Sequence, residues 1–163
     1  MEVAADRLWV MLQEIRAPGP ALDGAYDVLT ELANNAWQHG SDCYVIAQTH
    51  TGELSNTPGL QLAIADFGAG FRTSLSSYRP ETEVDAILKA FEEGVSATGD
   101  RLRGYGLNHV QRAIDRYEGS SLSIISHNGW VQRRRSEFDC RQGHDCAGVF
   151  IAAYFPFPFE GVT

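Results

Sequence analysis

A single predicted helix limits what this chain can fold into. Residues 27–40, DVLTELANNAWQHG, separate at about 100° per residue into an apolar half and a polar half. The apolar half predicts packing against a core, and the polar half alone is typical of a solvated face. Glu31, Asn35 and His39 are spaced four residues apart, so their side chains stack on successive turns. Because Asn35 and His39 lie at the edge of the apolar half, the stack is a candidate for holding a metal ion and a water or hydroxyl.

Length and charge exclude several classes of protein. With 163 residues, the chain fits one domain that can bury a full core. A net charge of −8 argues against a nucleic-acid partner bound by phosphate neutralisation. No apolar run approaches the roughly 20 residues of a membrane span, and the N-terminus lacks the apolar region of a signal peptide. Three cysteines, an odd number, suggest no disulfide framework, so we expect a cytoplasmic protein with no membrane or nucleic-acid partner.

The hydrophobic pattern predicts an α+β domain. We expect helices at residues 4–16, 21–39, 82–94 and 107–117, and strands at 43–50, 60–66, 121–126, 130–138 and 147–155. Helices covering one face of a mixed, mainly antiparallel sheet make a two-layer α/β sandwich. We therefore divide the chain into an N-terminal helix (1–19), one main domain (20–159) and a tail (160–163).

Turn signals fix the connections between these elements. The prolines of APGP, residues 17–20, cannot continue a helix from within and separate the first two helices. The strands at 43–50 and 60–66 are expected to pair as an antiparallel hairpin, and Asn128-Gly129 predicts a two-residue hairpin turn. Polar composition predicts loops over residues 72–81 and 140–146.

An acidic residue and several glycines stand where strands and helices end. Asp66 closes a predicted strand and is followed by Gly68 and Gly70, which let a ligand approach the backbone closely. Its carboxylate can accept a hydrogen bond from an exocyclic amino group such as that of adenine. Gly104 and Gly106 open the next predicted helix, whose free N–H groups and dipole favour phosphate.

The stacked residues of the long helix suit the remaining part of such a site. Asn35 supplies a carbonyl oxygen, the type of ligand that Mg²⁺ prefers together with water and phosphate oxygens. Glu31, one turn away, can orient or deprotonate an attacking hydroxyl or water. The order and separation of all these residues fit one site for ATP and Mg²⁺.

Three motifs resemble the signature of a known family. They are ExxxNAxxHG at 31–40, DxGxG at 66–70 and GxGL at 104–107. Together they look like the N, G1 and G2 boxes of the GHKL superfamily, which includes DNA gyrase, certain chaperones, histidine kinases, mismatch-repair ATPases and bacterial anti-sigma serine kinases. The resemblance covers roughly residues 20–156 and implies a Bergerat-type α/β sandwich that binds ATP with Mg²⁺.

The resemblance also implies residue roles. Asn35 would ligate Mg²⁺, Asp66 would read the adenine amino group, and residues 72–103 would form a mobile ATP lid. The other cofactor-binding residues that it implies are Gly68 and Gly70 in the adenine pocket, and Gly104, Tyr105, Gly106 and Leu107 around the phosphates. One departure concerns a further box that usually reads Gly-Thr, for which the best match here is Gly148-Val149. The threonine hydroxyl that helps bind adenine is therefore missing.

The character of these motifs favours a regulatory enzyme acting on a partner protein. Glu31 stands where many histidine kinases have asparagine, as in branches that use a general base. The first histidine is His39, inside the first motif, and we expect no transducer domain after Phe159. We therefore expect a stand-alone protein that transfers the ATP γ-phosphate to a serine or another residue of a partner, as anti-sigma serine kinases do.

Two alternatives stay open, and so does a homodimer. One is an ATP-sensing interaction module without turnover, and the other is an ATP-hydrolysing dimer clamp. Arg101 and Arg103 in the predicted lid are either cofactor-binding residues that stabilise charge on the transferred group or ordinary solvated loop charges.

Two further clusters favour ordinary structure over function. Cys140, His144 and Cys146 offer three nearby ligands, whereas structural zinc sites have four. We therefore interpret residues 140–146 as a polar loop. Arg133–Arg135 point to alternate faces of a predicted strand, which we interpret as solvated.

Overall fold

The sequence folds into helices and strands over most of its length. The computed structural model describes residues 10, 19–38, 42–50, 59–96 and 106–156. In chain order the elements are α2 (Gly19–Gln38), β1 (Cys43–His50), β2 (Gly59–Asp66), α3 (Gly70–Ser74), the 3-10 turn η1 (Ser76–Tyr78), α4 (Glu83–Ala90), α5 (Gly106–Asp115), β3 (Ser121–Ser126), β4 (Gly129–Arg134), β5 (Glu137–Gln142) and β6 (Val149–Pro156).

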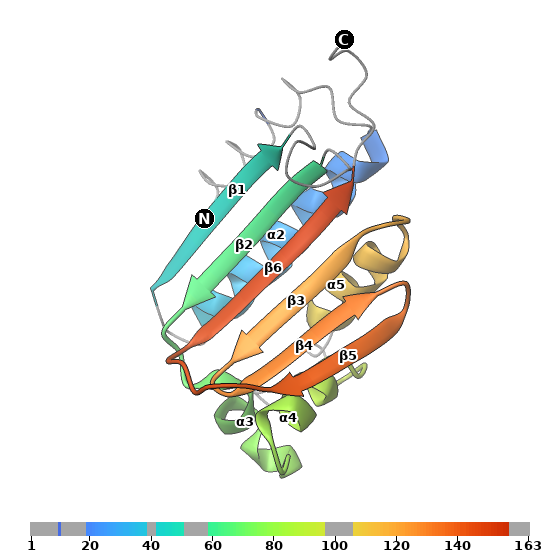
Figure 1. Ribbon diagram of the computed structural model, residues 1–163. Coiled ribbons are helices and arrows are strands. Elements are labelled where there is room, and N and C mark those ends of the chain that lie inside the picture. Colours follow the sequence, from blue (N-terminus) through green and yellow to red (C-terminus); the bar gives the residue numbers. More distant parts are fainter. Residues whose placement is uncertain (1–9, 11–18, 39–41, 51–58, 97–105, 157–163) are drawn as a thin grey trace.

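The strands form one six-stranded sheet in the order β1-β2-β6-β3-β4-β5 (Figure 1). Helix α2 packs on β1, β2 and β6, α5 lies beside α2 and on β3, and α4 packs on β3, β4 and β5. The predicted α+β two-layer architecture, with helices on one face, is confirmed. The sheet was predicted to be mixed, and this is wrong for the described strands, because all five of their pairings are antiparallel.

Alternating side chains place the core between the sheet and the helices. Leu60, Leu62 and Ile64 of β2 are each at most 2% exposed, as their period-two spacing predicted. Val28 and Leu32 of α2 are buried against the sheet. Since β6 lies between β2 and β3, its buried side chains join the two halves of the core.

The first and last turns of the helices depart slightly from prediction. Helix α2 begins at Gly19, two residues earlier than expected, because Pro20 is tolerated in a first turn, where its missing N–H has no helical partner. Of the predicted helix at 4–16, only Val10 is described, as helical and exposed. His39 and Gly40 lie outside the described residues.

Helix α4 begins at a capping box. Thr82 Oγ1 accepts a hydrogen bond from Asp85 N (3.1 Å), and the Asp85 carboxylate accepts one from Thr82 N (3.0 Å). This cap was predicted from the spacing of the two residues. The preceding residues 72–81 were predicted to be a loop, but they include most of α3 and all of η1, which are too short to show a hydrophobic period.

Two turns of the sheet differ from their predicted positions. Asn128-Gly129 was predicted as the β3–β4 turn, but the two-residue loop is His127-Asn128, with a φ of 47° at His127. A Cβ on Gly129 would come 2.7 Å from Glu83 Cβ, so this glycine is needed for the packing of α4 against β4.

The prediction of a single strand at 130–138 is also wrong. Arg135 and Ser136 have positive φ values and form a turn into β5, which was predicted as loop beyond residue 139.

Arg133 was interpreted as solvated, and this is wrong. It is only 5% exposed, because β4 turns it toward the helices. Its Nε and Nη2 donate to the two carboxylate oxygens of Asp115 in α5, at 3.0 and 2.7 Å. Its guanidinium also stacks 4.5 Å from the centre of the Phe138 ring. Arg133 therefore ties α5 to the sheet.

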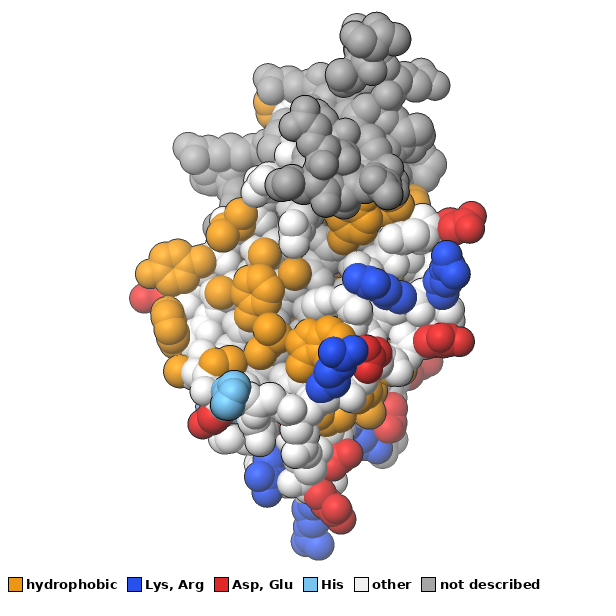
Figure 2. All heavy atoms as spheres, viewed as in Figure 1, with side chains coloured by type: hydrophobic (Ala, Val, Ile, Leu, Met, Phe, Trp, Pro, Cys, Tyr) orange, Lys and Arg blue, Asp and Glu red, His pale blue; other side chains and the backbone are white. Residues whose placement is uncertain are grey.

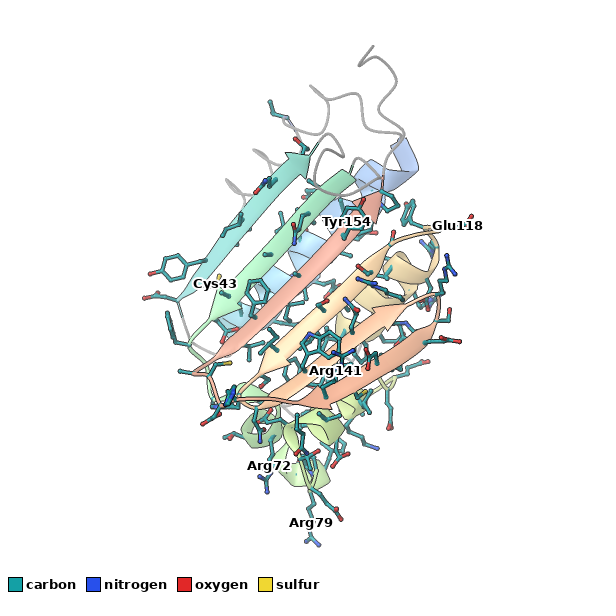
Figure 3. All side chains as sticks on the ribbon, in the orientation of Figure 1. Cys43, Arg72, Arg79, Glu118, Arg141 and Tyr154 are labelled. Atoms are coloured by element: carbon teal, nitrogen blue, oxygen red, sulfur yellow. The ribbon has the colours of Figure 1, made fainter. Side chains whose placement is uncertain are left out.

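Arg133→Ala is expected to lower the free energy of unfolding by about 2–4 kcal/mol, because it leaves a partly buried carboxylate unpaired and removes packing. Arg141→Ala is the matched control, since Arg141 lies on the open face of the sheet (Figure 3), where it pairs with exposed Asp139. Arg141→Ala is expected to lower the free energy of unfolding by about 0–1 kcal/mol. Urea denaturation measures both, and equal losses would contradict the structural role of Arg133.

The opposite face of the sheet carries no helix among the described residues. Figure 2 shows apolar side chains across it. Tyr44, Ile46 and Phe150 alternate along their strands with residues that face the core, and they are 64%, 59% and 39% exposed. Within the described part of the chain, no helix is long and apolar enough to cross a membrane.

Candidate functional site

One cavity brings together residues from distant parts of the chain. Its volume is about 330 Å³, within the range of sites for small molecules. Its walls come from α2, the end of β2, the residues leading into α3, the start of α5 and the start of β6. Six of the predicted site residues line it: Asn35, Asp66, Gly68, Gly70, Gly106 and Leu107.

Asp66 lies at the rim because β2 ends there. Its Oδ1 accepts a hydrogen bond from Gly68 N at 2.7 Å, which turns the chain sharply away from the sheet. The residue opposite Asp66 in the ladder is Val149, which also lines the cavity. A carboxylate therefore stands beside an apolar wall.

The chain requires glycine at two points around Asp66, one in the turn that follows it and one just before β6. Gly70 has a φ of +79°, and a Cβ on it would contact the His127 ring. Gly148, at the start of β6, has a φ of +85°, and a Cβ on it would contact the carbonyl oxygen of Asp66. Since positive φ is costly for other residues, both glycines shape the cavity wall.

The start of α5 faces the polar edge of α2. A Cβ on Gly106 would lie 3.1 Å from Asn35 Oδ1 and 3.3 Å from Glu31 Oε2. The two predicted side chains of α2 therefore converge on the first residue of α5, where helical N–H groups have no partner within the helix. Leu107 follows and is 7% exposed, which anchors this helix end in the core.

Glu31 belongs to a second hollow. It does not line the cavity but lies in an adjoining groove of about 360 Å³ between α2 and α5. There its Oε1 is 3.5 Å from Nδ1 of His109. His109 was not predicted as a site residue, although its place three residues after Gly106 puts it one turn along the same helix.

The cavity separates an apolar part from a polar part. Its apolar walls include the side chains of Leu32, Ala36, Ile64, Leu75, Val149 and Ile151. Asp66 offers an acceptor beside these walls, and Asn35 with Gly106 offers polar groups at the junction of α2 and α5. The arrangement suits a flat, amino-bearing ring joined to a polar, anionic group.

Several predicted residues cannot be placed in this site. Arg101, Arg103, Gly104 and Tyr105 lie outside the described residues, as does part of the predicted lid at 72–103. The described part of that segment contributes Ser74, Leu75, Ala90, Val95 and Ser96 to the cavity, none of which was predicted.

Cys140, His144 and Cys146 are not brought together as a group of metal-ligating side chains. No group of three or more metal-ligating side chains occurs among the residues that the structure describes. Burial, helped by the negative charge of Asp139, raises the pKa of the Cys140 thiol, and a raised pKa disfavours the thiolate that binds metal. The interpretation of these residues as structural is retained, although Cys140 to Gln142 belong to β5 rather than to a loop.

No protein-family model matches the chain, and no curated protein matches it either.

Proposed function

We propose that the chain is a GHKL-type domain of Bergerat fold that binds ATP with Mg²⁺ and transfers the γ-phosphate to a partner protein. The observation that carries this proposal is the convergence of Asn35, Asp66 and Gly106 on one cavity. These residues come from three motifs separated by dozens of residues, and two of them lie at the ends of elements where ligand groups can reach the backbone.

The apolar part of the cavity suits adenine. Asp66 Oδ1 is occupied by Gly68 N, which leaves the second carboxylate oxygen to accept from the exocyclic amino group. Val149 supplies apolar contact with the ring in place of the missing threonine hydroxyl. We expect adenine recognition to depend on Asp66 more than in relatives that keep the threonine.

The junction of α2 and α5 suits phosphates and their metal ion. Gly106 leaves open the space that a Cβ would take beside Asn35 Oδ1 and Glu31 Oε2. Asn35 Oδ1 would hold Mg²⁺, an ion that neutralises phosphate charge and prefers oxygen ligands. The first N–H groups of α5 would bind phosphate oxygens.

Glu31 would act as general base on the acceptor hydroxyl. In the transfer, the hydroxyl oxygen bonds to the γ-phosphorus as the bond to the β–γ bridging oxygen breaks. ADP leaves, and Glu31 takes the hydroxyl proton. His109, 3.5 Å away, would orient the Glu31 carboxylate toward the groove between α2 and α5.

Glu31→Gln is expected to keep nucleotide binding and to lower phosphate transfer or hydrolysis by about 10²–10⁴-fold, since an amide cannot take the proton. Label from γ-labelled ATP, followed into protein and into free phosphate, measures both reactions. Glu118→Gln, an exposed change at the far end of α5 (Figure 3), is the control and should leave both rates unchanged. Normal turnover in Glu31→Gln would remove Glu31 from the mechanism.

One observation favours the alternative of an ATP-sensing module. Glu31 does not line the cavity, and its carboxylate lies against His109. Nucleotide binding without transfer or phosphate release in the same assay would favour the module, whereas rapid phosphate release with ATP-driven dimerisation would favour a hydrolysing clamp.

A further inference from the structure

Helix α3 begins without a cap of its own. Ala69 precedes it and offers no side-chain hydrogen bond. Its first-turn N–H groups are instead satisfied by residues distant in sequence. Phe71 N donates to Ser126 Oγ at 3.1 Å, and Arg72 N donates to Glu83 Oε2 at 3.2 Å.

The two acceptors are themselves joined in the interior. Ser126 Oγ donates to Glu83 Oε2 at 2.8 Å, and the two residues are 0% and 7% exposed. A carboxylate is costly to bury unless hydrogen bonds satisfy it. Helix α4 does not need Glu83 as its cap, because Thr82 and Asp85 already fill that role.

This buried pair lies directly behind the wall of the cavity. Gly70 and Phe71 line the cavity, whereas Glu83 and Ser126 do not. A Cβ on Gly70 would come 2.9 Å from Ser126 Oγ, so the wall rests against this side chain. His127 directly follows Ser126 in the chain. Its Nε2 lies 3.2 Å from the Ala69 carbonyl oxygen and contacts the same segment of the wall.

We propose that Glu83, acting with Ser126, is a positioning residue that holds residues 66–72 in the shape that accepts the nucleotide. The inference rests on the proposed function for its ligand. Its geometry is independent, because a single oxygen, Glu83 Oε2, accepts both the serine hydroxyl and the amide of Arg72, the residue that follows the wall residue Phe71. A glutamine oxygen can accept the same two bonds, so the role depends on the acceptor and not on the charge.

The test compares four variants by calorimetric titration with Mg²⁺ and ADP. Glu83→Ala and Ser126→Ala are expected to weaken binding about tenfold, the effect of losing roughly one buried hydrogen bond's stabilisation. Glu83→Gln is expected to stay within about threefold of the wild type. Glu81→Ala is the matched control, since it removes an exposed carboxylate two residues before Glu83 but leaves the α4 cap and the wall contacts in place.

A second readout needs no nucleotide. Amide hydrogen exchange at Phe71 and Arg72 in the ligand-free protein is expected to become about tenfold faster in Glu83→Ala and Ser126→Ala, and to stay unchanged in Glu81→Ala. Unchanged exchange in both Glu83→Ala and Ser126→Ala would overturn the inference, as would equal loss of binding in Glu81→Ala. A wild type that binds no nucleotide would overturn the proposed function, and the exchange rates would still decide whether Glu83 anchors the wall.

Discussion

Asp66→Asn is expected to weaken ADP and ATP binding by about a hundredfold, the cost of a lost charge-assisted hydrogen bond and a misplaced donor. The wild-type carboxylate is acceptor-only, and Oδ1 is already used by Gly68 N at 2.7 Å. Asparagine has one oxygen. Whichever way its amide turns, an NH₂ group faces either the Gly68 N–H or the adenine amino group.

Calorimetric titration measures this effect, with Asp139→Asn on the exposed strand β5 as the control. Inosine triphosphate, which lacks the amino group, gives an independent arm. The wild type should bind it weakly, and Asp66→Asn should discriminate less between it and ATP. Equal ATP affinity in wild type and Asp66→Asn would show that Asp66 does not read the base, and a wild type that binds no adenine nucleotide would refute the site.

Gly148→Ala is expected to lower the free energy of unfolding by about 3–5 kcal/mol, from backbone strain and steric overlap together. Gly148 has a φ of +85°, and an added Cβ would contact the carbonyl oxygen of Asp66. The chain must therefore shift where β6 begins, beside the strand end that carries Asp66. Loss of nucleotide affinity should accompany the loss of stability.

Gly143→Ala is the matched control for this change. It lies in the same connection between β5 and β6, and an added Cβ there would have no heavy atom within 4 Å. Urea denaturation should show a change within about 0.5 kcal/mol for Gly143→Ala. Similar stability of the two variants would mean that the contact between Gly148 and Asp66 does not constrain the fold.

Elements with one buried face could be predicted from the sequence, and a strand exposed along its whole length could not. Strand β2 alternates because every second side chain is buried under α2, and its predicted hairpin with β1 is confirmed. Strand β5, Glu137–Gln142, was missed because all six of its residues are exposed, so burial imposes no hydrophobic period. The turn at His127 was misplaced because the need for Gly129 comes from a helix more than forty residues earlier in the chain.

The same distinction holds for the candidate site. Asn35, Asp66 and Gly70 were predicted because each belongs to a short motif with characteristic spacing. Glu83 and Ser126 were not, because their contacts join residues 43 and 55 positions apart. Local spacing carries no signal for such contacts, and only the assembled sheet brings them together.

The position of β6 has a consequence for how the molecule assembles. It is the last described strand, Val149–Pro156, yet it pairs with β2 on one side and β3 on the other. The hairpin of β1 and β2 and the meander of β3 to β5 can each form from neighbouring residues, but they become one sheet only when β6 is inserted between them. The pairing of β6 with β2 and β3 therefore closes long loops of the chain late in folding, and late closure of long loops slows folding. During synthesis the rim at Asp66 stays incomplete until Val149 has left the ribosome.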